Sequence, residues 1–503
     1  MSTVFDFQGA PGSGWSQPEP ITSERPPIPQ GLRRQRLPRW PRASEPELVR
    51  HYTGLSQKTF GIDTGFYPLG SCTMKHNPRV NERIVQLPGI DRIHPLQEDS
   101  QVQGLLSIYF EMQEMLAICS GMDAVTLQPV AGAQGEFTAI RCIQEYHKSK
   151  GESHRDKVIV PDSAHGTNPA SASMCGYQII EIPSASDGRL DIKALEAAIG
   201  PDTAAMMITN PSTLGLFETN IAEASRIVHE AGGQMYYDGA NFNAIIGKTD
   251  PGRMGFDAVH YNLHKTFSQP HGGGGPGSGP IGVKEHLSRF LPTPIASRRE
   301  SVEGDPPGVG DGYWYSWDDV GEGSIGKVQQ WNGNAGAVVR AWAFYRRYGH
   351  ELERMSEFAV LNSNYLRHRI MNPDSDVAAR IHCMPNEGAQ ADLVMHEFTL
   401  SMSPVKEMNG VTGKDVAKRL LDYGYMSPTL YFPQIVPECL MIEPTETESK
   451  EVLDKFAADF HEVLSEDPEI VKSAPHTTPV KRVDEVWAAR QLILRHPITD
   501  SED

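Results

Sequence analysis

Apolar and polar residues follow two different periods along the middle of the chain. Short, almost wholly apolar runs, such as IIEIP at 179–183 and AAMMI at 204–208, have the length of buried strands. Between such runs, DIKALEAAIG at 191–200 and NIAEASRIVHEAG at 220–232 place apolar residues at helical spacing. Continuous apolar strands separated by helices are typical of a parallel sheet covered on both faces. We therefore predict an α/β domain with a doubly wound, mostly parallel sheet over about 120–290.

The pattern continues on both sides of these segments. The stretch 121–146 indicates a short strand, a glycine-rich turn and a helix, which presents backbone amides at the helix start. We expect the run at 258–265 to form the last strand of the sheet. The remaining elements expected in this region are helices at 104–119 and 163–176 and strands at 157–162, 177–183 and 234–238.

A smaller α+β domain is expected after residue 335. Residues 335–370 predict a strongly amphipathic helix, broken near Gly349, that joins the two domains. The elements expected after it are a strand at 392–402, a helix at 412–424, an apolar segment at 439–444 and a helix at 446–464.

The chain is thus predicted to have four parts: an extended N-terminal arm at 1–60, a large cofactor-binding domain at 61–335, a small C-terminal domain at 336–475 and a tail at 476–503. The five arginines between 33 and 42 are compatible with a nucleic-acid tail. In so acidic a chain, an arm that lies on its own body or on a partner subunit is the favoured interpretation. Residues 65–80, GFYPLGSCTMKHNPRV, have the turn residues of a fixed loop, and we expect this loop to line a site.

Composition excludes several classes of function. The 503 residues include 46 Lys and Arg against 64 Asp and Glu, and the net charge of −18 argues against nucleic-acid binding. The six cysteines form no C-x-x-C pair and have no zinc-site spacing, so we expect reduced thiols and no metal. Without a secretory signal or an 18-residue apolar span, the expected location is the cytoplasm, away from membranes.

Lys265 is the first candidate for catalysis. It lies between the strand-like run and a stretch with glycine at six of the nine positions 272–280, where backbone can approach a ligand closely. A lysine in such a place suits imine chemistry with an aldehyde cofactor, although most lysines are solvated surface charges. Asp238 ends the strand-like run upstream. Because ligands bind beyond the carboxyl ends of strands in open α/β sheets, we expect Asp238 and Lys265 to reach one cleft.

Further residues supply the other parts of a pyridoxal 5'-phosphate site. A helix N-terminus attracts the phosphate, an imidazole stacks on the ring, and a carboxylate holds the proton on the pyridine nitrogen. Each residue alone has a simpler interpretation, as a helix-opening turn, a surface histidine, a turn former or a strand-end cap. The candidates are Gly132, Ala133 and Gln134 for the phosphate, His165 for the ring face, Thr209 for the phenolic oxygen or phosphate, Asp238 for the nitrogen, Ala240 and His264 as further contacts and Lys265 for the imine.

A competing motif is weak. Gly277, Gly279 and Gly282 match the dinucleotide fingerprint G-x-G-x-x-G, but Pro280 lies inside the match and no βαβ unit frames it. The chain also has no G-x-x-x-x-G-K-[ST] phosphate loop.

Seven segments together resemble one known family. They are FYPLGSCTMKHNP, LQPVAGAQGE, DSAHGTNPASA, TNPSTLGLFE, DGANFNAIIG, NLHKTFSQPHGGGGPGSGPIGV and LYFPQIVPECLMIEPTETESKE. Their amino-acid sequences are similar to those of glycine dehydrogenase (decarboxylating), the P-protein of the glycine cleavage system, and the resemblance covers about 60–460. The length resembles the lysine-bearing subunit 2 of the two-subunit form. HKTFSQPHGGGG departs from the commoner HKTFCIPHGGGG, and SPTLYFP from APTVYFP; neither change touches the lysine.

The resemblance implies a pyridoxal-phosphate fold type I (aspartate aminotransferase-like) enzyme. Lys265 then matches the Schiff-base lysine, and Asp238 and His165 match ring-holding positions. The implied reaction decarboxylates glycine and transfers the aminomethyl group to the lipoyl arm of H-protein. The implied assembly is a heterotetramer with two copies each of this chain and of glycine dehydrogenase subunit 1.

Two alternatives stay open at this point. The first is another fold type I enzyme, such as an amino acid decarboxylase or a cysteine desulfurase-like protein. The second is a non-catalytic scaffold subunit that only docks a partner; the pairing of Lys265 with Asp238 speaks against it.

Overall fold

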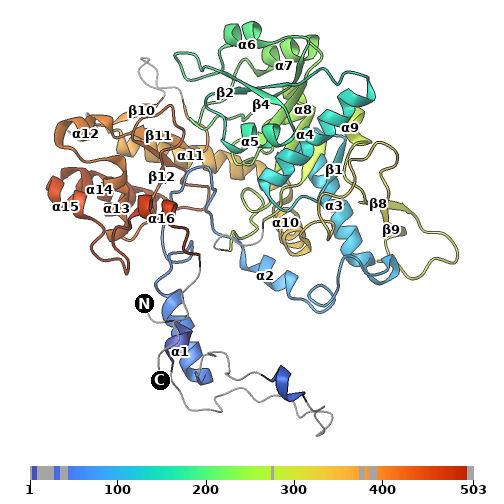
Figure 1. The fold of residues 1–503 in the computed structure, drawn as a ribbon, viewed down its shortest axis with the longest axis horizontal. Helices are drawn as coiled ribbons and strands as arrows, with labels where there is room; N and C mark the ends of the chain where they lie inside the picture. Colours follow the sequence, from blue (N-terminus) through green and yellow to red (C-terminus); the bar gives the residue numbers. More distant parts are fainter. Residues whose placement is uncertain are drawn as a thin grey trace. The chain divides into compact units, whose positions relative to one another are not determined.

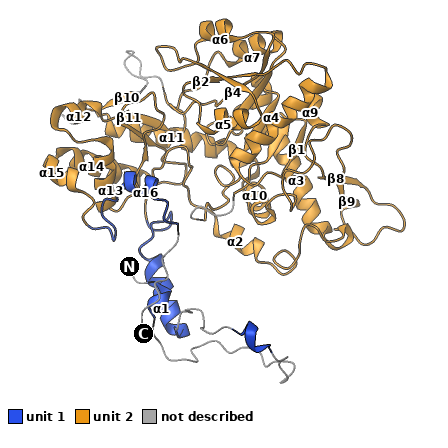
Figure 2. Ribbon diagram, in the orientation of Figure 1, with its two compact units in different colours: residues 1–64, 477–503 blue, residues 65–476 orange. Residues whose placement is uncertain are grey.

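A computed structural model describes residues 3–7, 28–33, 43–272, 277–372, 380–384 and 393–494. The chain divides into two compact units, one of residues 65–476 and one of residues 1–64 with 477–503 (Figure 2). Residues 34–42, with four of the five arginines between 33 and 42, lie outside the described residues, as do the glycines at 273–275.

The smaller unit contains short helices. Residues 45–56 of the predicted extended arm form a helix instead, α1 (Glu45–Ser56). Its start is stabilised by a capping box, in which the amide of Glu47 donates to Ser44 Oγ and the Glu47 carboxylate accepts from the amide of Ser44. The other helices are η1 (Val4–Asp6), η2 (Gln30–Leu32) and α16 (Glu485–Arg490).

The larger unit is built around a seven-stranded sheet with the order β1-β7-β6-β5-β4-β2-β3. Strands β2 to β6 are parallel, as predicted, whereas β7 is antiparallel to both β1 and β6. The run at 258–265 is therefore not the last strand. The strands are β1 (Ala124–Thr126), β2 (Lys157–Pro161), β3 (Gln178–Ile182), β4 (Thr203–Ile208), β5 (Gln234–Gly239), β6 (Ala258–Tyr261) and β7 (Ile281–Val283).

Helices cover both faces of this sheet (Figure 1). Met206 and Tyr237 belong to an apolar cluster with α3, α6, α7 and α10, whereas their neighbours Met207 and Tyr236 pack with α4, α5 and α9. Successive residues of a strand point to opposite faces, so the two clusters mark the two faces of a doubly wound sheet. The helices are α2 (Arg79–Val85), η3 (Asp99–Gln101), α3 (Gln103–Ser120), α4 (Gly132–Ser149), α5 (Thr167–Met174), α6 (Ile192–Ala198), α7 (Ile221–Glu230), α8 (Pro251–Met254), α9 (Glu285–Ser288) and α10 (Ala335–Tyr348).

Two features of this region differ from the prediction. β3 lies at the edge of the sheet, where Gln178 and Glu181 are exposed, so its apolar run is not covered on both faces. Beyond β7 and α9 the chain forms a hairpin of β8 (Ile295–Glu300) and β9 (Tyr313–Asp318), for which no element was predicted. The predicted break near Gly349 is confirmed: α10 ends there, and a turn of 3-10 helix, η4 (Gly349–Glu351), leads into α11 (Leu352–Ile370).

A second, antiparallel sheet follows, with the order β10-β11-β13-β12. The predicted strand at 392–402 is shorter than expected, because the described strand β11 covers only Phe398–Ser401. Both sheets belong to the same compact unit, so the domain boundary at 335/336 remains a prediction. The elements are β10 (His382–Met384), β11, α12 (Ser403–Asn409), α13 (Gly413–Asp422), β12 (Thr429–Leu430), β13 (Cys439–Ile442), α14 (Lys450–Ser465) and α15 (Pro468–Ser473).

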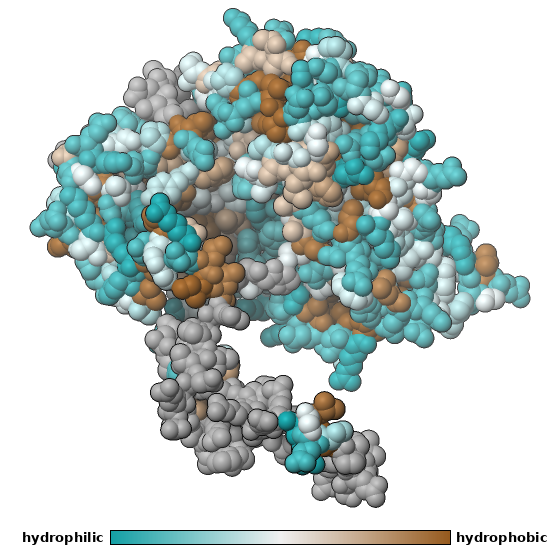
Figure 3. Space-filling view, in the orientation of Figure 1, coloured by the Kyte–Doolittle hydropathy of each residue, from teal (hydrophilic) through white to brown (hydrophobic). Residues whose placement is uncertain are grey.

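The surface agrees with the charged composition. On the face drawn in Figure 3, hydrophilic residues predominate and apolar residues occur in small groups. No described helix has the length and apolar character needed to cross a bilayer.

Candidate active site

One cavity collects the ends of four parallel strands. His165 follows β2, Thr209 follows β4, Asp238 is the penultimate residue of β5, and Lys265 comes four residues after β6. Parallel strands place their carboxyl ends at one edge of a sheet, which explains why residues a hundred positions apart meet here. The predicted residues that line this cavity are Gly132, Ala133, His165, Thr209, Asp238, Ala240 and Lys265.

The start of α4 forms one end of the cavity. Gly132 and Ala133 open the helix, and its N-cap residue, Ala131, provides no side-chain cap for the first amides. Nearby, Thr209 Oγ1 is buried without a hydrogen-bond partner among the described residues. Gly279 lets the loop before β7 pass close to this turn, because a Cβ at position 279 would lie 2.0 Å from the Ala131 oxygen. Free amides, a helix dipole and an unpaired hydroxyl together favour an anion at this end.

Two predicted contacts do not line the cavity. Gln134 uses its side chain to hold the turn, since Oε1 accepts from the amide of Val130 at 2.8 Å and Nε2 donates to the Val328 oxygen at 2.7 Å. His264 Nδ1 accepts from the amide of Ser278 at 3.3 Å. Both residues support the walls of the cavity from behind.

Asp238 is a buried carboxylate held by three partners. Asn168 Nδ2 donates to Oδ2 at 2.9 Å, the amide of Ala240 donates to Oδ1 at 3.1 Å, and His260 Nε2 lies 3.6 Å from Oδ1. Burial alone raises the pKa of Asp238, but His260, the Asn168 amide and its other neighbours outweigh burial and lower the pKa below the ordinary value. Asp238 therefore stays negative at neutral pH and offers a charged acceptor to a protonated ring nitrogen.

His165 is positioned by a short relay of side chains. Its Nδ1 lies 2.7 Å from Thr167 Oγ1, and the same hydroxyl donates to Glu136 Oε1 at 2.7 Å. The ring also meets Phe432 edge-on, with the centroids 5.3 Å apart. These contacts fix the orientation of an imidazole that is open to the cavity, as a ring-stacking role requires.

Glu136 is a much weaker acid than an ordinary glutamate. Burial, followed by the charge of Asp238, raises its pKa to about 8. Above its unfolded pKa of about 4.3 this carboxyl group ionises in the unfolded chain but not in the folded protein. The protein therefore loses unfolding free energy as pH rises from that value to the folded-state pKa. We expect Glu136→Gln to gain unfolding free energy relative to the wild type between pH 5 and pH 8, by on the order of 1 to 3 kcal/mol. Urea unfolding of the cofactor-free proteins measures this difference, and equal pH slopes contradict the prediction.

Lys265 lies in a turn that Lys75 braces from behind. The ammonium group of Lys75, from the predicted loop at 65–80, donates to the Thr266 oxygen at 2.8 Å and to Glu446 Oε1 at 2.6 Å. It also lies 4.8 Å from the centre of the Phe344 ring, and its side chain is 1% exposed. A single buried cation thus joins the loop, the lysine turn and the segment after β13.

This brace predicts a large effect on stability. Lys75→Met leaves the Glu446 carboxylate without its cation, and we expect a loss of about 3 to 5 kcal/mol in unfolding free energy, as is usual when one partner of a buried pair is removed. Lys248→Met, which breaks the exposed pairs with Glu353 and Glu357, is the matched control and costs at most about 1 kcal/mol. Equal losses in a denaturant titration of the two variants exclude a bracing role.

Comparison with known proteins identifies the family. The chain is 51% identical to “Probable glycine dehydrogenase (decarboxylating) subunit 2” of Nitrosospira multiformis over 98% of this chain and 95% of that protein. It is 49% identical to the protein of the same name from Pyrococcus furiosus, with the same coverage. The chain belongs to the glycine dehydrogenase (decarboxylating) subunit 2 family.

Family models agree with this membership. The model described as glycine dehydrogenase, C-terminal domain, matches residues 355–482, and the model of class-V aminotransferases matches residues 134–275. The subunit 2 relative from Halalkalibacterium halodurans is 50% identical over 99% of this chain and 98% of its own length.

Solved structures confirm the predicted fold class. An inhibitor-bound glycine decarboxylase (P-protein) of the glycine cleavage system aligns with a TM-score of 0.67 at 17% identity, covering 88% of this chain and 92% of that one. A NifS-like protein aligns with a TM-score of 0.58 at 15% identity, covering 80% and 99%. At such identities the likeness concerns the fold alone, and that fold is pyridoxal-phosphate fold type I.

Several lining residues of this family member were missed from sequence. The loop at 65–80 was expected to line a site, and its Ser71 does so. Glu136 and Thr167 lie within the segments LQPVAGAQGE and DSAHGTNPASA, but no feature of the sequence marked either residue individually. His396 and Glu397 were recognisable in the sequence, because they are a charged or titratable pair inside the mostly apolar run VMHEFTL. The other lining residues that were not predicted are Pro211, Thr213, Asn241, His260 and Asn262.

Proposed function

We propose that this chain is the pyridoxal-phosphate-carrying subunit of a two-subunit glycine dehydrogenase, and that it decarboxylates glycine. The observation that carries the proposal is the convergence of Lys265, Asp238 and the uncapped start of α4 on one cavity, in a chain about half identical to subunit 2 proteins. The cavity without the sequence identity would be weaker support, because the fold is shared by enzymes with other substrates.

The described residues fit this cofactor. The uncapped amides of Gly132 and Ala133 and the unpartnered Thr209 hydroxyl suit a phosphate. Asp238 suits the ring nitrogen, His165 suits the ring face and Lys265 carries the amine for the aldehyde. Bound there, the cofactor supplies an electron sink for the pair of electrons that decarboxylation releases.

The side chains have separate tasks in this chemistry. Asp238 keeps a proton on the ring nitrogen, and the bonds from Asn168 and Ala240 hold its carboxylate in place. His165 would pack its imidazole against the face of the cofactor ring. Lys265 would hold the cofactor through its amine, and the same amine, when free, would be the group in the cavity that carries a proton.

The partners follow from the same proposal. Glycine is the substrate, lipoylated H-protein receives the aminomethyl group on its disulfide, and glycine dehydrogenase subunit 1 completes a heterotetramer with two chains of each kind. The proposed location is the cytoplasm, and neither nucleic acid nor membrane takes part.

An exchange assay tests the function. The purified chain with its partner subunit, glycine, labelled bicarbonate and lipoylated H-protein should incorporate label into glycine. Absence of exchange with the complete set of components contradicts the proposal. Release of sulfide from cysteine under the same conditions supports the desulfurase-like alternative instead. Repeating the exchange without subunit 1 shows whether this chain is active alone.

A further inference from the structure

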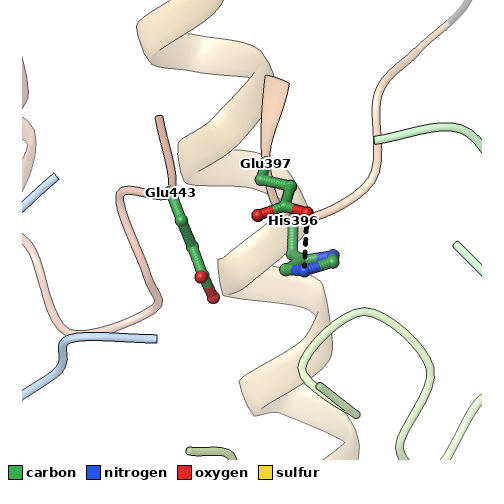
Figure 4. Close-up of side chains that lie close together, drawn as sticks. All are labelled: His396, Glu397 and Glu443. Carbon is green, nitrogen blue, oxygen red and sulfur yellow. Dashed lines mark ion pairs between the residues drawn. The ribbon is translucent and has the colours of Figure 1, made fainter. Parts of the chain in front are cut away.

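Three buried acid-base side chains stand together at the wall of the cavity. His396 and Glu397 precede β11, and Glu443 follows β13. Their nitrogen and oxygen atoms lie within 4.8 Å of one another, and Figure 4 shows the three side chains facing a common space. His396 and Glu397 line the cavity that contains Lys265, whereas Glu443 lies behind them.

The loop at 65–80 is shaped to hold the two glutamates. Ser71 and Thr73 adopt left-handed backbone angles, with φ of 63° and 51°, which are costly for residues other than glycine. In this conformation the amide of Ser71 donates to Glu397 Oε2 at 2.7 Å, and the amide of Thr73 donates to Glu443 Oε2 at 2.9 Å. Backbone strain that serves two buried carboxyl groups points to a functional site.

The remaining acceptors of Glu443 are also satisfied. Thr73 Oγ1 and Asn241 Nδ2 both donate to its Oε1, each at 2.9 Å. By contrast, both ring nitrogens of His396 are buried without a hydrogen-bond partner in the described part of the chain, and Nε2 lies 3.8 Å from Glu397 Oε1. The amide and hydroxyl donors occupy positions that a metal ion would need, which favours a proton over a cation in this cluster.

The charge balance leads to the same conclusion. Among the described residues, no lysine or arginine forms an ion pair with Glu397 or Glu443, although their side chains are 4% or less exposed. Burial, and for Glu397 also the charge of Glu443, raises the pKa of each carboxyl group well above its ordinary value. Repulsion between two buried carboxylates with no cation paired to either favours one proton on the pair at neutral pH.

The other groups that face the pair do not remove this proton. Burial lowers the pKa of His396 to about 3 and raises that of Cys439 to about 12, so both are neutral. Burial also raises the pKa of Cys72, on the opposing loop. Lys265 is the facing cation in the described residues, and its charge favours the ionised carboxylates once the proton has left.

We propose that Glu397, sharing a proton with Glu443 beside His396, is the acid that protonates the departing sulfur of the disulfide substrate. The inference rests on the proposed function. When the aminomethyl carbon bonds to one sulfur, the S–S bond breaks and its electron pair leaves on the other sulfur. That sulfur takes the Glu397 proton and becomes a thiol, Glu397 becomes a carboxylate, and solvent restores the proton. Glu397 is the donor because it lines the cavity and Glu443 does not.

Infrared spectroscopy of the cofactor-free protein tests the proton itself. At pH 7 the wild type should show a protonated-carboxyl band, separate from that of Glu136, that Glu397→Gln and Glu443→Gln each remove and that vanishes in the wild type at higher pH. Glu448→Gln is the matched control: it is a half-buried glutamate in the same segment, outside the cavity, and burial raises its pKa to about 7, so its substitution should remove only its own contribution and keep this band. If Glu397→Gln and Glu443→Gln leave the wild-type spectrum unchanged, both groups are ionised and the proposal is wrong.

Kinetics of the holoenzyme tests the role. In Glu397→Gln, appearance of the lipoyl thiol should slow on the order of 100-fold, the usual contribution of a general acid, while glycine still changes the cofactor absorbance. Glu397→Asp should recover part of the rate, and Glu448→Gln should match the wild type. A Glu397→Gln rate equal to that of the wild type overturns the proposal, and so does Mn²⁺ binding that both Glu397→Gln and Glu443→Gln abolish. Loss of exchange in the wild type is a failure of the proposed function, whereas the infrared result does not depend on it.

Discussion

Replacing Lys265 with alanine is expected to remove both the covalent attachment of the cofactor and glycine-bicarbonate exchange. Lys265 is the lysine that lines the cavity, and no second lysine lines it among the described residues. The visible absorbance of the lysine-bound cofactor should disappear in Lys265→Ala. Exchange should fall by roughly a thousand-fold or more, as expected when a group that acts covalently is lost.

A second lysine provides the control for this experiment. Lys284 follows β7 and pairs with Asp123 at 2.9 Å, outside the cavity lining. Lys284→Ala should keep both the absorbance and the exchange rate. A Lys265→Ala protein that retains the absorbance band assigns the covalent link to another residue, and the site described above is then wrong.

The strand-end residues could be predicted because their positions follow from a local rule. A buried apolar run identifies a parallel strand, and the residue after it lies at the carboxyl edge of the sheet. Thr209, Asp238 and Lys265 each follow such a run, so their convergence needed no knowledge of side-chain contacts. The same rule fails for β7, whose three residues form an antiparallel strand between β1 and β6 after a glycine-rich loop.

Residues contributed by the second sheet could not be placed in this way. His396 and Glu397 reach the cavity from a segment more than 130 positions after Lys265, and Glu443 joins them only because β13 pairs with β11. The register Phe398 to Ile442 brings these residues to neighbouring strand ends, and that register depends on tertiary packing. The polar pair inside an apolar run was a visible irregularity, but the sequence did not show which surface it faced.

Asp238→Asn is expected to have the second largest effect on catalysis. The substitution keeps the size of the side chain but removes the charge that is proposed to hold a proton on the ring nitrogen. Exchange should fall on the order of 100-fold or more, the range for the loss of one preorganised charged contact. Asp162→Asn, at the end of β2 and bonded to Ser184, is the matched control and should keep wild-type activity.

The acid stability of the cofactor-free protein provides an independent measurement of the same charge. Because the folded-state pKa of Asp238 is lowered by His260, Asn168 and other neighbours despite its burial, the ionised carboxylate stabilises the fold above its unfolded pKa, about 3.9. This stabilisation is lost as pH falls through the lower, folded value. The difference in unfolding free energy between wild type and Asp238→Asn should therefore shrink as pH is lowered below about 4. A difference that is constant with pH, together with unchanged exchange, shows that Asp238 is not held as an anion and cannot keep the cofactor ring protonated.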